Sequence, residues 1–173
     1  TPSEELDDYD WVSPPAMRER RTVPGLWAAY EAVAPTVETV ATDATHGSAW
    51  LSVRALEVLR DRAAVADDAS TVAAVARDLR DARPSMAAVA NRVNAVMASG
   101  ERTPAAIRER AAAAAEAALD ADADAAALAA ERCGDAVVSL SRSGTVATAL
   151  RSARPAVLLG AVDPGHRQAA QRL

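Results

Sequence analysis

Apolar residues recur every three or four positions through most of the chain, which predicts a series of amphipathic helices. The first helical stretch follows Gly25 and is interrupted at Pro35, because proline cannot continue a helix. A second stretch is expected to break or kink at residues 45–47. Two shorter stretches and one long one follow, as far as residue 133. The predicted apolar stripes consist of Leu26, Trp27, Tyr30, Val33, Trp50, Leu51, Val53, Leu56, Leu59, Val72, Val75, Leu79, Met86, Val89, Val93 and Val96.

Residues typical of helix starts mark three of these stretches. Ser70 is a good N-cap residue, and Pro84 suits a first helical position. The longest stretch begins with Thr103 as a cap and Pro104 in the first turn. It extends over up to about 29 residues, or roughly 43 Å. Alanine dominates this stretch and has the highest helix propensity, but each alanine buries little area. The acidic residues of this stretch are expected to form a face that is exposed to solvent. The alternative is that this face is a contact surface between subunits of an oligomer.

The pattern changes after Gly134. Residues 135–140 (DAVVSL) and 154–160 (RPAVLLG) are typical of short buried strands, and residues 143–153 between them are typical of a helix. Strand, helix and strand with short connections predict a parallel sheet covered by helices. Two strands do not form a stable sheet alone, so we expect the sheet to continue beyond a truncated C-terminus or to be completed by a partner.

The expected fold class is therefore mainly α, with an N-terminal helical bundle followed by the start of an α/β, Rossmann-like domain with a parallel sheet. Residues 1–24 are predicted to form an extension, residues 25–133 the helical domain, and residues 134–173 the beginning of the Rossmann-like domain. The extension has too few apolar residues for a core of its own. Within it, Tyr9–Val12 is predicted as a short edge strand that ends at Pro14 and Pro15.

Composition narrows the class of protein further. All 19 basic residues of the 173 are arginine, against 24 acidic residues, and the net charge is -5. This halophile-like composition argues against a direct nucleic-acid binder, which would carry a basic stripe. No apolar run reaches the roughly 20 residues of a membrane span, so we expect a cytoplasmic protein without a membrane partner. The single cysteine, Cys133, excludes an internal disulfide and is expected to be a small buried hydrophobic residue; no cofactor or metal is expected.

The turn between the first late strand and its helix is the best candidate for chemistry. It would direct backbone N–H groups, hydroxyls and the positive end of a helix dipole at one place, which suits a phosphate group. A simpler interpretation, compatible with the first, is that a serine of the turn only caps the helix. The candidate phosphate-binding residues of this turn are Ser141, Arg142, Ser143, Gly144 and Thr145.

Two motifs resemble the superfamily of translation initiation factor 2B alpha, beta and delta subunits. That superfamily includes methylthioribose-1-phosphate isomerase and archaeal ribose-1,5-bisphosphate isomerase. Residues 82–93 (ARPSMAAVANRV) resemble its Arg-Pro-Thr/Ser helix start, and residues 137–160 (VVSLSRSGTVATALRSARPAVLLG) resemble the opening of its C-terminal domain. The likeness covers roughly residues 36–173. The segment LDDYDWVSPPAMRERRTVPGLW looks like the tail of a Nudix hydrolase domain, although the Nudix box itself is absent.

The resemblance implies further site residues. Arg83 matches an arginine that contacts substrate in the isomerases; the alternative is a surface arginine paired with Asp78 or Asp81. His46, Gly47 and Ser48 match the isomerases' Arg-Gly-Ala substrate loop. The alternative for His46 is that it does not contact a ligand and only caps the loop or is exposed to solvent.

The same resemblance argues against catalysis. Ser141 stands where the isomerases have a cysteine that takes part in proton transfer, and a serine hydroxyl is poorly suited to that task because its pKa is far higher. The partner aspartate of those enzymes would lie beyond Leu173. We therefore assign no catalytic residue. The resemblance favours a protein that is not an enzyme.

The resemblance implies a translation initiation factor 2B-like regulatory protein that binds a phosphorylated sugar or nucleotide without turnover. Its expected partners are that phosphorylated small molecule and either a second copy of the chain or a related subunit. The alternative is a fragment of a sugar-phosphate aldose-ketose isomerase or of a Nudix hydrolase fusion enzyme. A third possibility is a decayed remnant that folds but binds nothing.

Overall fold

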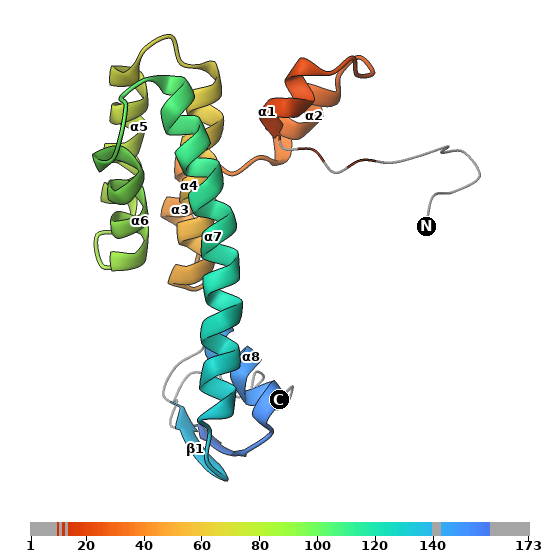
Figure 1. Ribbon diagram of the computed structural model, residues 1–173, viewed down its shortest axis with the longest axis vertical. Coiled ribbons are helices and arrows are strands. Elements are labelled where there is room, and N and C mark those ends of the chain that lie inside the picture. Colours follow the sequence, from red (N-terminus) through yellow and green to blue (C-terminus); the bar gives the residue numbers. More distant parts are fainter. Residues whose placement is uncertain (1–9, 11, 13, 140–142, 160–173) are drawn as a thin grey trace, which may run out of the picture.

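The computed structural model describes residues 10, 12, 14–139 and 143–159, and it shows a mainly helical protein with a small parallel sheet (Figure 1). This fold class was expected from the sequence. The helices and strands in chain order are α1 (Pro14–Glu19), α2 (Leu26–Val33), α3 (Val37–Thr42), α4 (Ser48–Val65), α5 (Ala69–Ala82), α6 (Ala87–Ala98), α7 (Pro104–Glu131), β1 (Ala136–Ser139), α8 (Gly144–Ala153) and β2 (Ala156–Leu159).

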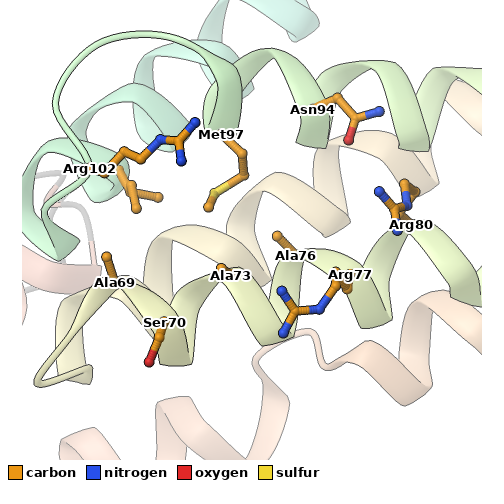
Figure 2. Close-up of a pocket in the computed structure, with 10 residues that line it drawn as sticks. Ala69, Ser70, Ala73, Ala76, Arg77, Arg80, Asn94, Met97 and Arg102 are labelled. Atoms are coloured by element: carbon orange, nitrogen blue, oxygen red, sulfur yellow. The ribbon is translucent and has the colours of Figure 1, made fainter.

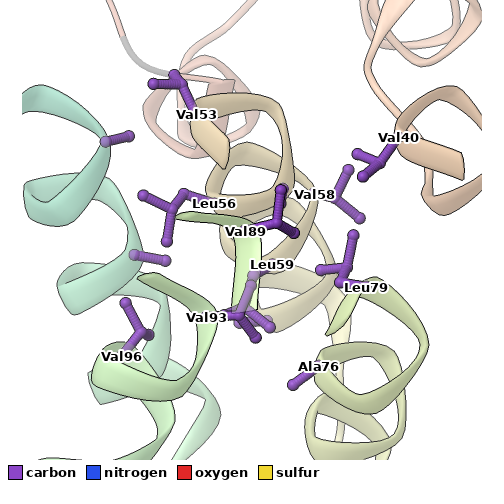
Figure 3. Close-up of a cluster of buried hydrophobic side chains, with 14 of the residues drawn as sticks. Val40, Val53, Leu56, Val58, Leu59, Ala76, Leu79, Val89, Val93 and Val96 are labelled. Carbon is purple, nitrogen blue, oxygen red and sulfur yellow. The ribbon is translucent and has the colours of Figure 1, made fainter. Parts of the chain in front are cut away.

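Helix α4 is the centre of the bundle. It packs against α3, α5, α6 and α7, so nearly half of its residues are buried. Among them Leu51, Leu56 and Leu59 are fully enclosed, while Trp50 at the first turn remains 36% exposed. Figure 3 shows Leu56 and Leu59 of α4 close to valines of α6, with Leu79 of α5 nearby. The stripes predicted for α4, α5 and α6 therefore meet around α4. The stripe predicted from Leu26 to Val33 does not reach this core, because no residue of α2 is buried and Val33 is 80% exposed.

The long helix α7 connects the bundle to the α/β part of the chain. Thr103 caps it by accepting a hydrogen bond from the amide of Ala106, and Pro104 occupies its first turn, as the sequence predicted. Over its first half, Ile107 and alanines pack into the bundle core. Its second half packs on α8, where Ala126 is buried (Figure 1). At 28 residues the helix spans about 42 Å.

The starts of α5 and α6 differ from the sequence prediction. The N-cap of α5 is Asp68, whose carboxylate accepts from the amide of Thr71, and Ser70 lies inside the helix. Both residue types are strong caps, and the earlier one adds a negative charge at the positive end of the helix. Pro84 precedes α6 rather than opening it, because a turn from Arg83 O to the amide of Met86 comes first.

The βαβ unit expected near the end of the chain is present. Strands β1 and β2 pair in parallel, with Ala136 opposite Ala156 and Val138 opposite Leu158, and α8 lies between them in sequence. Ala149 and Leu150 of α8 are buried. In Figure 1 this unit lies beside the lower half of α7.

The expected edge strand at Tyr9–Val12 is not found in the part that can be described. Asp10 and Val12 lie in no strand, whereas Tyr9 and Trp11 lie outside the described residues. Pro14 begins the helix α1 instead of simply ending a strand, because the fixed φ of proline suits a first helical turn. Helix α1 packs on α2 and touches the bundle at α4.

Gly100, in the α6–α7 connection, provides a test of this fold. Its φ is +67°, and a Cβ there would lie 3.1 Å from Nη1 of Arg110. That arginine caps α6 by donating to the carbonyl of Val96. Gly100→Ala is therefore expected to lower the free energy of unfolding by about 1–2 kcal/mol, measured by urea denaturation. Gly134→Ala is the control, because that site has an ordinary φ and open space; an equal loss in both variants would contradict the prediction.

Candidate functional site

The N-terminus of α8 carries the described part of the serine turn. Ser143 is the N-cap, and its Oγ accepts a hydrogen bond from the amide of Val146 at 3.4 Å. Within the part of the chain that is described, no acceptor takes the amide hydrogens of Gly144 or Thr145. Gly144 is exposed, and a Cβ placed on it would have no atom within 4 Å. Ser141 and Arg142 lie outside the described residues.

Thr145 has a structural partner. Its hydroxyl donates to the carboxylate of Asp122 on α7, which fastens α8 to the long helix. The carboxylate also lies near the positive end of α8, where a negative charge is favoured. The backbone amides of the turn, rather than the Thr145 hydroxyl, are therefore the groups left for a ligand.

Arg83 occupies a position that differs from the surface ion pair considered from sequence. It follows the last residue of α5, and its side chain is partly buried. Its Nε donates to the carbonyl of Val40 at 2.7 Å, and Nη2 donates to the carbonyl of Asp43. Asp81 pairs with Arg80 instead, at 3.3 Å. Arg83 thus holds the C-terminal end of α3, whose last carbonyls have no partner within the helix.

His46, Gly47 and Ser48 lie in the loop between α3 and α4 and in the first turn of α4. The carboxylate of Asp43 accepts from the backbone amide of His46 at 2.7 Å and bonds its Nδ1 at 2.8 Å. The imidazole stacks on Trp50, with ring centroids 3.8 Å apart. The cap of this loop is Asp43, whose carboxylate accepts from the amides of Thr45 and His46, and His46 is exposed, as in the second alternative considered for it. Gly47 caps α4 with no side-chain hydrogen bond, which leaves the first amides of that helix uncapped by side chains.

These hydrogen bonds have a consequence for stability at acid pH. The bonds from the His46 side chain and from its backbone amide hold the pKa of Asp43 well below its usual value. A carboxylate with a depressed native pKa stabilises the fold above its unfolded pKa of about 4, and this contribution is lost as the pH falls through the native pKa. Asp43→Asn is therefore expected to be less stable than the wild type at pH 6, with a difference that shrinks towards pH 3.

Urea denaturation midpoints of the two proteins at several pH values measure this difference. All other carboxylates are common to both proteins, so their titration cancels. A difference that stays constant or grows on acidification would contradict the role given to Asp43.

A hydrogen bond brings two of the candidate groups together, and no hydrogen bond between described residues joins the third group to them. The bond from Arg83 to Asp43 joins the arginine to the 43–48 loop at the lower end of the bundle (Figure 1). Helix α8 lies below that end, beside α7. No hydrogen bond or ion pair between described residues joins Arg83 to the described residues of the serine turn.

Sequence analysis missed a polar cluster between α2 and α4. The hydroxyl of Tyr30 donates to the carboxylate of Asp61, and Nη2 of Arg60 donates to the Tyr30 oxygen at 3.2 Å. Burial, together with the bond to Asp61, raises the pKa of Tyr30. This cluster fastens the α1–α2 hairpin to the bundle. Only the apolar spacing of Tyr30 was visible in the sequence.

Neither a metal site nor a membrane span is found in the parts of the chain that the structure describes. Among those residues, no three histidine, cysteine or acidic side chains gather as metal ligands would. None of the described helices has the length and apolar character needed to cross a bilayer. Cys133, expected to be buried, is half-buried where α7 leads into β1.

The fold defines a class of protein in which a helical bundle is joined through one long helix to a parallel βαβ unit. A family model for the Initiation factor 2 subunit family matches residues 44–162, from the loop before α4 to just beyond β2. The chain belongs to this family. Comparisons with curated proteins and with solved structures each find no match.

Proposed function

We propose that the chain is a regulatory protein, similar to translation initiation factor 2B subunits, that binds a phosphorylated sugar or nucleotide without turning it over. The observation that carries this proposal is the open N-terminus of α8, where Gly144 exposes helix amides that have no described acceptor. Backbone amides and the helix dipole at such a place favour a phosphate group.

The lower end of the bundle supports the proposal with a second open helix start. Helix α4 has 18 residues, no acidic residue in its first turn and no side-chain cap at Gly47. Arg83 acts on this site indirectly, because it fixes the loop that leads into α4. In the proposed complex the amides of Gly47 and Ser48 contact the sugar or phosphate from the bundle side. Ser141 and Arg142, which lie outside the described residues, remain candidate phosphate contacts because they directly precede Ser143 in the sequence.

The proposed role excludes catalysis because Ser141 replaces the cysteine implied by the family resemblance. Turnover of ribose 1,5-bisphosphate by the purified chain would contradict this part of the proposal. It would favour an aldose-ketose isomerase instead.

Self-association, or association with a related subunit, is part of the proposed function. Large apolar side chains are exposed on three neighbouring elements of the α/β part: Leu119 and Leu128 on α7, Val138 on β1 and Val146 on α8. Their exposed fractions range from 39% to 64%. Exposed apolar side chains on neighbouring elements fit an interaction surface when they lie in one patch.

Thermal unfolding with and without ribose 5-phosphate or AMP tests the binding proposal. A ligand at about 100 times its Kd adds about 2.7 kcal/mol to the stability of the native state, which corresponds to a rise in Tm of several degrees for a chain of this size. Gly144→Val is expected to keep the Tm of the free protein and to lose the ligand-induced rise, because the new side chain covers the open amides. Gly134→Val, at another open glycine, is the matched control. No rise with any phosphorylated compound would overturn the proposal.

A further inference from the structure

Another face of the bundle carries a groove that is lined in part by arginines. It lies between α5 and α6, is closed at one end by the start of α7, and has a volume of about 510 Å³ (Figure 2). This volume is within the range of small-molecule sites in proteins. No residue of α8 or of the 43–48 loop contributes to its lining, so it is separate from the site proposed above.

The charge of the groove is opposite to that of the chain. Three of the ten lining residues are arginines, Arg77, Arg80 and Arg102, and none is acidic, although the whole chain has a net charge of -5. Arg80 has a weak partner in the adjacent Asp81, in an exposed pair at 3.3 Å. Arg77 and Arg102 make no hydrogen bond or ion pair with the residues that the structure describes. Their donors are available to an anion.

The floor of the groove is apolar and its wall carries an amide. Ala73 and Ala76 leave the space open on the α5 side, and Met97 extends into it from α6 (Figure 2). Asn94 lies further along α6, towards Arg80, with its amide exposed. A side-chain amide has both donors and an acceptor, as the edge of a nucleobase does. Methionine adapts its shape to flat ring systems.

We propose that this groove binds a small organic polyanion of the nucleoside diphosphate class. The phosphates bind guanidinium groups, which match phosphate oxygens in geometry and charge. The nucleoside lies over the alanine and methionine floor, within reach of Asn94. This ligand site goes beyond the one proposed at α8 and does not depend on it.

Isothermal titration with ADP and with inorganic pyrophosphate tests the inference, using the full chain carrying Gly144→Val so that the α8 site does not contribute. ADP is expected to bind more tightly than pyrophosphate, because only ADP contacts the apolar floor. The further double variant Arg77→Gln/Arg102→Gln is expected to weaken ADP binding by about 30-fold, since two charge-assisted contacts are lost. Raising the salt concentration is expected to weaken binding as well.

The matched control is Arg62→Gln/Arg151→Gln, which removes the same charge from two exposed arginines outside the groove. Its ADP affinity should stay within about twofold of the parent protein, as expected when only distant exposed charges change. The inference is overturned if ADP does not bind, if both double variants lose affinity equally, or if pyrophosphate binds as tightly as ADP. The ribose 5-phosphate response of the otherwise native chain should survive Arg77→Gln/Arg102→Gln, so the two proposals fail separately.

Discussion

Replacing Leu56 by alanine is expected to lower the free energy of unfolding by about 3–5 kcal/mol, at the upper end of the range for such substitutions. Leu56 is fully buried in the middle of α4 and belongs to the core shared with α6 and α7. The wall contributed by α7 consists largely of alanines, including Ala111 and Ala115. These side chains have no rotamers with which to fill a cavity, so the site cannot collapse around the missing atoms.

Equilibrium urea denaturation measures this loss. Val65→Ala is the matched control, because Val65 is 48% exposed at the end of α4 and its truncation should cost less than about 1 kcal/mol. A loss at Leu56 no larger than that at Val65 would show that α4 is not the centre of the core.

The second large effect is expected at Arg83. Arg83→Met keeps most of the apolar length of the side chain but removes both bonds to the carbonyls at the end of α3. Each charge-assisted bond contributes about 1.5–3 kcal/mol, and partial access of water to the carbonyls offsets some of the loss, so we expect a decrease in stability of about 2–3 kcal/mol. Arg83→Lys should recover less than half of it, because one ammonium group does not reproduce a fork that reaches two carbonyls.

Urea denaturation of these variants separates an anchoring role from a ligand contact. Arg80→Met is the control, since the pair that Arg80 makes with Asp81 is exposed and its loss should cost less than about 1 kcal/mol. If Arg83→Met is as stable as Arg80→Met, the arginine does not anchor α3, and direct contact with a ligand becomes the better account of it.

The sequence predicted the fold well where the signal was local and periodic. The break at residues 45–47, the cap at Thr103 and the strands around α8 were all visible, because each depends on a few neighbouring residues. The starts of α5 and α6 were predicted at the wrong residues, because each sequence offers two positions at which the helix could begin. Asp68 and Ser70 are both good caps, and Pro84 is compatible with a turn as well as with a first helical position.

The polar contacts of the candidate site could not be predicted in the same way. Arg83 reaches a carbonyl 43 positions earlier, and Arg92 donates to the buried Ser52 from 40 positions away. Such pairs produce no pattern in the local spacing of residues, because they form only when two helices pack side by side. For the same reason the basic groove was not foreseen, since Arg102 comes close to Arg77 and Arg80 only when the helices pack, and all three lie among acidic residues in the sequence.

Residue-resolved NMR can show whether a phosphate group binds at the start of α8. The ¹⁵N-labelled chain is titrated with ribose 5-phosphate, and the shifts of the backbone amides are followed. Binding at this place is expected to shift the amides of Gly144 and Thr145 most, together with those of Gly47 and Ser48, and Gly144→Val is expected to abolish these shifts. Unchanged amides at Gly144 and Thr145 in the presence of saturating ligand would contradict it.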